Sequence, residues 1–185
     1  MKEERIQNVK PKEYCGIKYR STLEADTAKT LDTLGIPFLY EHRKIVLLEG
    51  FRCIYSKEKV RAITYTPDFE IGNIIIECKG FETPEWKNKK KYLFKYLMKK
   101  EPKTFFYEAH NAINDVIGAL DRHLDDLGYI VEVSTPDKDN VSKYKSIMEA
   151  KMAMRLEGKS NTPINNALLN GKKAYGHLWR IIRKQ

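Results

Sequence analysis

Two carboxylates and a lysine lie in and beside an apolar stretch near the middle of the sequence. Residues 66–80 read TPDFEIGNIIIECKG, with Asp68 before the apolar run and with Glu77 and Lys79 at its end. In an extended strand, residues two apart share one face, so Glu77 and Lys79 are neighbours. An ion pair explains these two charges, because charged groups in a buried strand must be paired or bind a metal. It leaves Asp68 unexplained.

A reverse turn at Gly72-Asn73 would bring Asp68 alongside Glu77. Two converging carboxylates offer the oxygen ligands that Mg²⁺ prefers, with positions left for water and phosphate oxygens. The metal would lower the pKa of a bound water. Lys79 would orient or deprotonate that water, or stabilise the negative charge of the phosphate. Together these residues predict the hydrolysis of phosphodiester bonds.

The elements that position these residues follow from the hydrophobic pattern. Ser21, with Glu24 three residues later at capping-box spacing, begins a helix that Gly35 ends. Strands are predicted over 38–48, 62–69 and 71–81, with an irregular hairpin connection over 49–61. A lysine-rich helix over 84–100, a short buried strand over 104–109 and a helix over 114–127 follow. This order predicts a compact α/β core of about 125 residues.

The character of the sequence changes after Gly128. A short strand over 129–133 leads into a polar loop, and two short helices are expected over 146–156 and 162–170. We therefore predict two domains, 1–130 and 131–185.

Composition predicts where the protein works. No apolar run approaches the ~20 residues that span a bilayer, and the first ten residues contain no hydrophobic segment of signal type. The three cysteines are widely spaced and fit neither a disulfide framework nor a zinc site. These features predict a cytoplasmic protein without a membrane partner.

Basic charge is concentrated in two blocks of a chain whose formal net charge is +9. Residues 86–103 contain eight lysines and one acidic residue, and 138–185 contain eleven basic and three acidic residues. Between them, 104–137 contains seven acidic residues and one arginine. This layout is typical of a nucleic-acid binder, although each block also fits a solvated helix surface. In the first block we expect contacts with DNA phosphates from Lys87, Lys89, Lys90 and Lys91.

The order Pro67-Asp68, hydrophobic strand, Glu77-Cys78-Lys79 resembles the signature of the PD-(D/E)xK nuclease superfamily. The likeness spans roughly residues 14–110 and looks particularly like phage-borne members related to junction-resolving endonucleases. It implies an α/β (α+β) fold with a restriction-endonuclease-like core, in which a mixed central sheet is flanked by helices. It also implies Mg²⁺ as the cofactor, with Mn²⁺ as an alternative, and a bacterial host cell as the location.

The same resemblance assigns roles to individual residues. Asp68 and Glu77 would be metal ligands together with the backbone carbonyl of Cys78, and Lys79 would be the catalytic lysine. Glu24 would be a further ligand or a water-positioning group, although its spacing from the N-cap also fits a capping box alone. The Cys78 side chain should face away from the site into packing.

The C-terminal segment is similar to the nuclease-associated modular helix-turn-helix motif of phage and intron homing endonucleases. The likeness rests on Ser146-Ile147, Glu149-Ala150, Ile164, Ala167-Leu168, Asn170-Gly171-Lys172-Lys173, Tyr175-Gly176 and Trp179. It implies a small helical DNA-binding subdomain whose outward-pointing residues read bases or hold phosphates: Asn165, Asn166, Asn170, Lys172 and Lys173. An insertion around 156–162 departs from the motif. The alternative is a helical cap on the core, anchored by Trp179.

Four functions follow from these features. We favour a metal-dependent DNA endonuclease of homing type, in which the core cuts double-stranded DNA and the tail chooses the site. A structure-selective resolvase of Holliday junctions or other branched DNA would share the core but require a homodimer to place two cuts. A non-catalytic DNA-binding module is the third, and the presence of Glu24, Asp68, Glu77 and Lys79 argues against it. The fourth is a basic RNA-binding protein without enzymatic activity.

Overall fold

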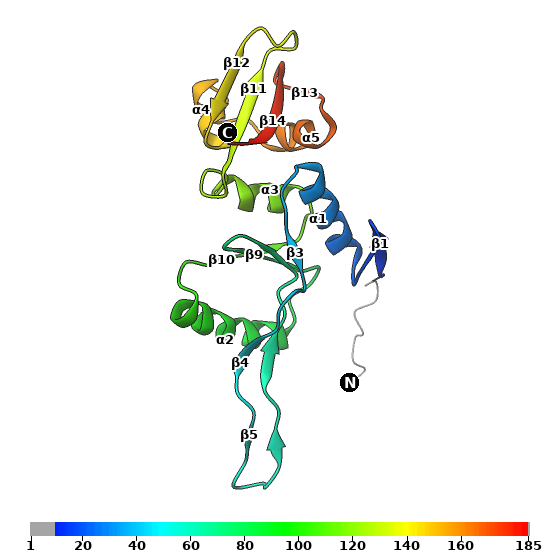
Figure 1. Cartoon of the computed structure of the whole chain (residues 1–185), viewed down its shortest axis with the longest axis vertical. Coiled ribbons are helices and arrows are strands. Elements are labelled where there is room, and N and C mark those ends of the chain that lie inside the picture. The colour runs from blue at the N-terminus through cyan, green and yellow to red at the C-terminus, as the bar shows by residue number, and fades with distance from the viewer. Residues whose placement is uncertain (1–9, 185) are drawn as a thin grey trace. The chain divides into compact units, whose positions relative to one another are not determined.

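A computed structural model describes residues 10–184, with five helices and fourteen strands (Figure 1). The helices are α1 Thr22–Thr33, α2 Pro84–Lys100, α3 Asn114–Asp121, α4 Ile147–Ala153 and α5 Thr162–Asn170. Each lies where the sequence predicts a helix, although α3 and α4 are shorter than predicted. Within the described residues, no helix is both long and apolar enough to cross a membrane. The predicted absence of a signal segment concerns residues 1–10, of which 1–9 lie outside the described range.

The chain divides into two compact units, and each is described by itself. The central unit is Phe38–Ala109. The terminal unit combines the chain up to Pro37 with the chain from His110 onward. The predicted division into 1–130 and 131–185 assigns functions to parts of the chain, and it stays a prediction.

The central unit contains a four-stranded mixed sheet in the order β10-β9-β8-β3. Its strands are β3 Leu39–Tyr40, β8 Phe69–Ile71, β9 Ile74–Cys78 and β10 Phe105–Ala109. β9 and β10 are parallel and the other pairs are antiparallel, which confirms the mixed α and β class. β10 is an edge strand in which Phe105 is 42% exposed, so the prediction of a buried strand there is wrong. Likeness to a restriction endonuclease stays a prediction.

The hairpin between β8 and β9 has the predicted turn. Ile71 pairs with Ile74, so Gly72 and Asn73 form a two-residue loop. Gly72 has φ +58°, a conformation that favours glycine and that type II′ turns require at their first central residue. Because the turn fixes the register, it also fixes which residues of the two strands face each other.

The predicted strand over 38–48 is wrong, because it is two strands in different sheets. β3 pairs with β8, whereas β4 Ile45–Leu48 pairs with β7 Ile63–Tyr65. Glu41, between β3 and β4, has φ +44°. Arg43 then binds Glu101 through two hydrogen bonds of 2.7 and 2.9 Å and also contacts Glu70. The charged residues that follow β3 are therefore occupied by ion pairs rather than by strand pairing.

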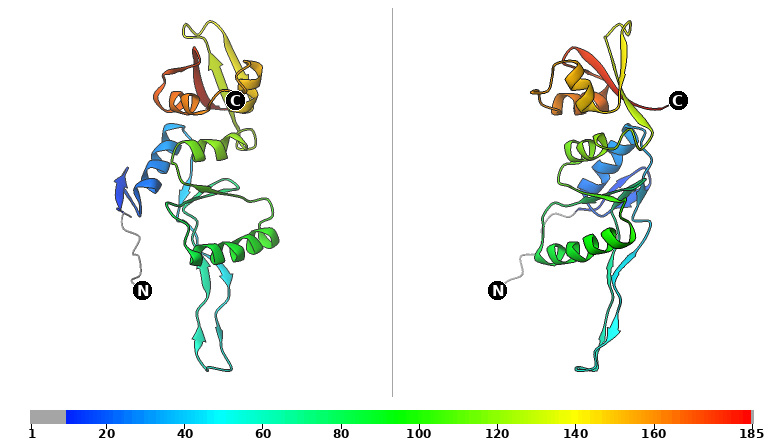
Figure 2. Two further views of the ribbon diagram at one scale, coloured as in Figure 1. Left: turned by 180° about the vertical axis from the view of Figure 1, so that it is seen from behind. Right: turned by 90° about the vertical axis from the view of Figure 1, so that its left-hand side faces the viewer.

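A two-stranded antiparallel ribbon occupies the region predicted to be an irregular hairpin connection, so the hairpin is confirmed and its strands are paired. β5 Phe51–Arg52 pairs with β6 Lys59–Val60 and continues the pairing of β4 with β7. We call residues 45–65 the arm. Figures 1 and 2 show in three views that its strands run away from α2 as a narrow projection of the central unit.

One face of α2 forms the core of the central unit with the base of the arm. Thr83 caps the helix by accepting a hydrogen bond from the Trp86 N–H at 3.1 Å, and Pro84 occupies its first turn. The residues of this core are Ile45, Tyr65, Ile75, Trp86, Leu93 and Leu97. α2 therefore covers the face of β9 that carries Ile75, and by alternation also Glu77.

The terminal unit contains an antiparallel sheet that the sequence did not predict. β11 Tyr129–Ser134, β12 Val141–Tyr144, β13 Lys173–Ala174 and β14 His177–Arg183 lie in the order β12-β11-β14-β13. β14 pairs with β11 over six residues. The prediction of a helical tail is therefore wrong, since the last strand completes a sheet with a partner some fifty residues earlier in the chain. The unit also contains the hairpin of β1 Lys12–Tyr14 and β2 Ile17–Tyr19.

Candidate active site

The β8–β9 hairpin places two buried carboxylates at opposing positions. Phe69 pairs with Ile76, so one further step of the register sets Asp68 opposite Glu77. Asp68 is 4% exposed and Glu77 is 3% exposed. Burying two carboxylates side by side is unfavourable unless cations or hydrogen-bond donors compensate both.

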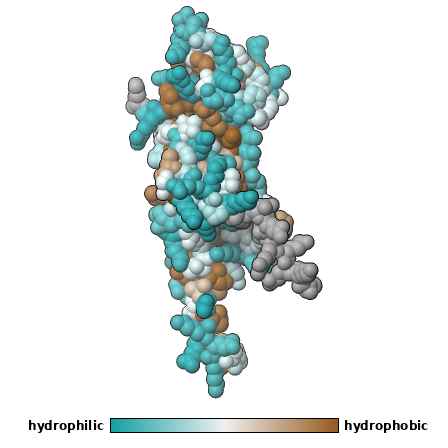
Figure 3. All heavy atoms as spheres, turned by 90° about the vertical axis from the view of Figure 1, so that its right-hand side faces the viewer, coloured by the Kyte–Doolittle hydropathy of each residue, from teal (hydrophilic) through white to brown (hydrophobic). Residues whose placement is uncertain are grey.

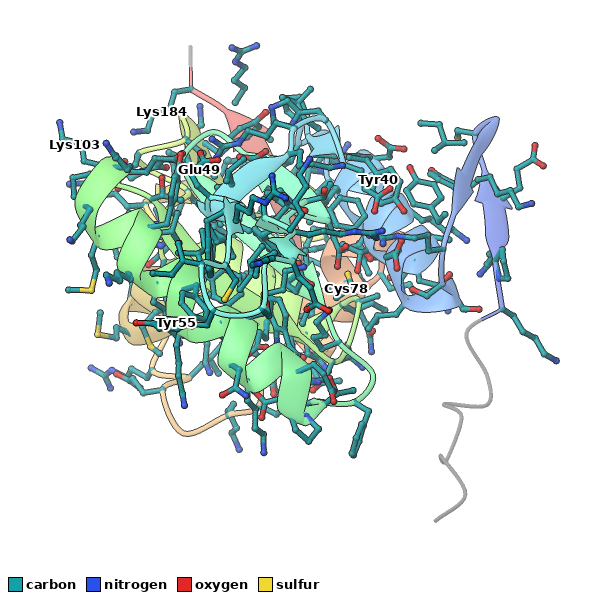
Figure 4. All side chains as sticks on the ribbon, turned by 90° about the horizontal axis from the view of Figure 1, so that it is seen from below. Tyr40, Glu49, Tyr55, Cys78, Lys103 and Lys184 are labelled. Carbon is teal, nitrogen blue, oxygen red and sulfur yellow. The ribbon has the colours of Figure 1, made fainter. Side chains whose placement is uncertain are left out.

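Asp68 is tied to the backbone of the neighbouring strand. Its Oδ2 accepts a hydrogen bond from the Cys78 N–H at 2.8 Å. This bond orients the carboxylate toward the segment that contains Glu77 and Lys79. Cys78 is a buried free cysteine (labelled in Figure 4), and by strand alternation its side chain lies on the opposite face from theirs.

Glu77 is held by a neutral and a charged donor at once. Its Oε2 accepts a hydrogen bond from the Tyr65 hydroxyl at 2.6 Å, and its Oε1 lies 2.5 Å from the Lys79 ammonium. Burial, followed by the charge of Glu77, raises the pKa of Tyr65 above its ordinary value. The phenol therefore stays protonated and remains a donor at any pH at which the protein would work.

Lys79 lies at the edge of the site, between the carboxylate and an aromatic ring. Its side chain is 24% exposed, and its ammonium is 4.3 Å from the centre of the Trp86 ring. An ammonium over an indole face is attracted by the ring quadrupole. Lys79 thus combines contact with Glu77 with access to solvent.

A second layer of charges surrounds Trp86. The Trp86 Nε1–H donates to Glu108 at 2.6 Å, and Glu108 pairs with Glu77 in the register of β9 and β10. Lys90 contacts Glu108 at 2.7 Å and also Glu82. Hydrogen bonds from Lys90 to Glu108 and Glu82 raise the pKa of the Lys90 ammonium.

Three residues of this cluster were missed by sequence reasoning. No role in the site was predicted for Tyr65 or Trp86, and Glu108 lies in the segment 104–109 that was predicted to be a short buried strand. The only sequence signal for Glu108 is a carboxylate in an otherwise apolar strand, the same pattern that singled out Glu77. Nothing in the spacing indicates that the two glutamates occupy neighbouring strands.

The predicted phosphate-binding lysines of α2 differ from one another. Lys87 and Lys91 are exposed and Lys89 is half-buried, as DNA contacts allow. Lys90 is different, because its ammonium is shared between two carboxylates and its side chain is only 19% exposed. Lys90 therefore belongs to an internal ion-pair network, and its contact with DNA phosphates stays a prediction.

Glu24 belongs to the terminal unit and forms the predicted capping box of α1. Its N–H donates to the Ser21 hydroxyl at 3.1 Å, and its Oε1 accepts the Ser21 hydroxyl at 2.8 Å. Its Oε2 accepts the Arg20 N–H at 3.1 Å. The capping interpretation is therefore confirmed. The role of Glu24 as a metal ligand stays a prediction.

The predicted base-reading residues of the tail are exposed with one exception. Asn166, Asn170, Lys172 and Lys173 lie on the surface. Asn165 is 3% exposed, and its amide donates to Asn114 Oδ1 at 2.9 Å. The prediction that Asn165 points outward is wrong, because the contact between α5 and α3 encloses this side of the helix.

Trp179, predicted to be a packing residue, is 2% exposed and donates its indole N–H to the Ala174 carbonyl at 3.0 Å. Its predicted role in packing is confirmed.

The donor set at Asp68 and Glu77 fits a hard divalent cation. Both side chains supply oxygen, as would the Cys78 carbonyl. Among residues 10–184, no group of three or more His, Cys, Asp or Glu side chains is arranged to hold a metal. Mg²⁺ commonly binds through one or two carboxylates and fills its remaining positions with water and phosphate oxygens. The two carboxylates present suit that mode of binding.

Comparisons with known proteins found no match to a family model, to a curated protein or to a solved structure. The functional interpretation therefore rests on the residues of the central unit and on their geometry.

Proposed function

We propose that the chain is a metal-dependent endonuclease that hydrolyses phosphodiester bonds in DNA. The observation that carries the proposal is the opposition of buried Asp68 and Glu77 in one hairpin, with Lys79 on the same face as Glu77. A divalent cation between the two carboxylates would bind both and would provide a binding point for phosphate.

Each residue of the cluster has a distinct role in this proposal. Asp68, Glu77 and the Cys78 carbonyl would hold Mg²⁺, or Mn²⁺ in its place. The metal, when bound, supplies Lewis acidity and a water of lowered pKa. Lys79 would exchange its contact with Glu77 for the phosphate, whose developing negative charge it stabilises. Tyr65 would keep Glu77 oriented during that exchange, since its hydrogen bond goes to the other carboxylate oxygen.

The proposed substrate is DNA, and the favoured form is site-selective cleavage of a duplex. The formal net charge of +9 suits a polyanion, and the exposed Asn166, Asn170, Lys172 and Lys173 are proposed to select the site. Resolution of branched DNA is the alternative.

Incubation of the protein with linear duplex or with a four-way junction, in Mg²⁺ and in EDTA, tests the proposal. We expect cleavage that needs the metal and that is abolished in Asp68→Asn and Lys79→Ala. Lys44→Ala, which removes an exposed lysine of the same unit outside both basic blocks, is the matched control and should cut normally. The absence of cleavage on both substrates, or equal cleavage by all variants, would overturn the proposal. If only the junction is cleaved, the site-selective homing function is wrong and the resolution of branched DNA takes its place.

A test of the tail uses a library of duplex sequences. Asn166→Ala combined with Asn170→Ala should reduce the preference among sites while metal-dependent cutting persists. Unchanged preference would mean that these side chains do not select the site.

A further inference from the structure

The arm has two chemically different faces. Residues that are directly opposite in an antiparallel pair share a face, and adjacent pairs alternate between faces. Phe51 pairs with Val60, and these side chains are 53% and 38% exposed. Arg52 pairs with Lys59 on the other face, and both are exposed.

The cationic face is electrostatically unfavourable in the isolated protein. Like charges directly opposite each other in a ribbon are destabilising. Within residues 10–184, neither Arg52 nor Lys59 forms an ion pair that would relieve the repulsion. A polyanion laid along this face would turn the repulsion into attraction.

The tip of the arm presents two large hydrophobic side chains to solvent, beside the exposed Ser56, Lys57 and Glu58. Ile54 is 80% exposed and Tyr55 is 92% exposed. The Cys53 N–H donates to the Glu58 carbonyl at 2.8 Å and closes the tip loop. Figure 4 looks onto the arm from below and labels Tyr55, and Figure 3 shows apolar and polar side chains intermixed on the projection. A two-stranded ribbon without a core is marginally stable in water, so this element suits a role in which a partner covers it.

The base of the arm is part of the candidate active site. Ile45 and Tyr65 begin and end the arm, and both pack with Trp86 in the core of the central unit. Tyr65 also donates the hydrogen bond to Glu77. A partner bound along the arm would therefore be held at a fixed distance from the carboxylates.

We propose that the arm lies in the major groove of duplex DNA beside the cut site. The major groove admits a two-stranded ribbon, and Arg52 and Lys59 would face phosphates while Ile54 and Tyr55 contact bases at the tip. From Ile45 at its base to Tyr55 at its tip the arm has about ten residue steps, which gives a reach of at most about 33 Å at the rise of a β-strand. That reach corresponds to about ten base pairs at about 3.4 Å per step. The choice of DNA as the partner rests on the proposed function.

Binding to a 30-base-pair duplex, measured by fluorescence anisotropy without divalent metal, tests the arm separately from cleavage. We expect Arg52→Ala combined with Lys59→Ala to lower the affinity on the order of tenfold, from two exposed charge contacts. The slope of log affinity against log salt should fall by about 2. Ile54→Ser combined with Tyr55→Ser should weaken binding and leave the slope unchanged.

Matched controls replace exposed residues outside the arm. Lys18→Ala and Ile17→Ser should leave the affinity unchanged. An RNA duplex has a deep, narrow major groove, so the arm variants should not alter its binding. Equal losses on RNA would overturn the groove assignment.

Two results distinguish this inference from the proposed function. Normal DNA binding by both arm variants overturns the role of the arm, whatever the protein cleaves. A change of oligomeric state in the arm variants, measured by light scattering, with unchanged DNA affinity would also overturn it and would identify a second copy of the chain as the occupant. If the wild-type chain binds DNA through the arm but cleaves none, the DNA-binding role of the arm is supported and the proposed nuclease activity is overturned.

Discussion

Replacing Tyr65 by Phe removes a single hydroxyl from the centre of the candidate site. The side chain is 2% exposed, and the hydroxyl donates to Glu77 at 2.6 Å. Because the acceptor is a carboxylate, the lost bond should lower the free energy of unfolding by about 1.5–3 kcal/mol. For a chain of this size that corresponds to a fall in Tm of about 3–12 °C.

Urea unfolding followed by tryptophan fluorescence measures this loss, since Trp86 lies beside the site. Tyr92→Phe removes a hydroxyl from an exposed tyrosine of α2 and should stay within about 0.5 kcal/mol of wild type. If Tyr65→Phe unfolds at the wild-type midpoint, the hydroxyl does not support a buried carboxylate and the geometry of the site is misjudged.

The same variant tests the coupling of Tyr65 to metal binding. A residue that orients a metal ligand typically changes metal affinity or activity by about 10–100-fold when it is removed. We expect the Mg²⁺ concentration for half-maximal cleavage to rise by at least about tenfold, with substrate affinity in EDTA unchanged. A purely structural tyrosine would lower Tm without moving the Mg²⁺ titration.

Three further predictions concern an ion pair and a glycine of the central unit and a glycine of α3. Arg43 lowers the pKa of Glu101, chiefly through its hydrogen bonds, so this carboxyl stabilises the fold above its unfolded pKa and loses that contribution as pH falls through the folded value. Arg43→Gln should therefore cost about 1–3 kcal/mol in neutral urea titrations and less in acidic ones; an equal loss at both pH values would contradict the ion pair. A Cβ at Gly50 would lie 2.9 Å from the Val60 carbonyl oxygen, so Gly50→Ala should part the arm strands and speed amide exchange there, and unchanged exchange would refute this. In α3, where a Cβ at Gly118 meets nothing within 4 Å, Gly118→Ala should instead raise the free energy of unfolding by about 0.5–1 kcal/mol in the same titration.

The parts of the site that the sequence predicted are those set by local chain geometry. A two-residue turn at Gly72 and a strict two-residue alternation are enough to oppose Asp68 and Glu77 and to put Lys79 on the face of Glu77. The capping box of Ser21 and Glu24 is equally local, since it joins residues three apart on one helical turn.

Other predictions failed where pairing or packing acts over long sequence separations. Strand β14 pairs with β11, some fifty residues earlier in the chain, and no local sequence pattern predicts this pairing. The Asn165 side chain was predicted to point outward because it follows the core residue Ile164 on the helix, yet the contact with α3 buries it. The ion pairs of Lys90 with Glu82 and Glu108 were likewise not predicted.

By itself, the sequence determined the pair of carboxylates, the lysine beside them and the basic character of the chain. The turn and the strand alternation depend only on residues that are close in the chain, and the charge follows directly from composition. Tertiary structure alone decided that Tyr65 and Trp86 would hold Glu77 and Lys79, because their meeting depends on the packing of α2 against β7 and β9. It also decided that the predicted hairpin connection after β4 would be regularly paired as an arm. Cross-strand pairing of Phe51 with Val60 sets one face of that arm, and the physical reason is that pairing selects partners by register and not by nearness in the chain.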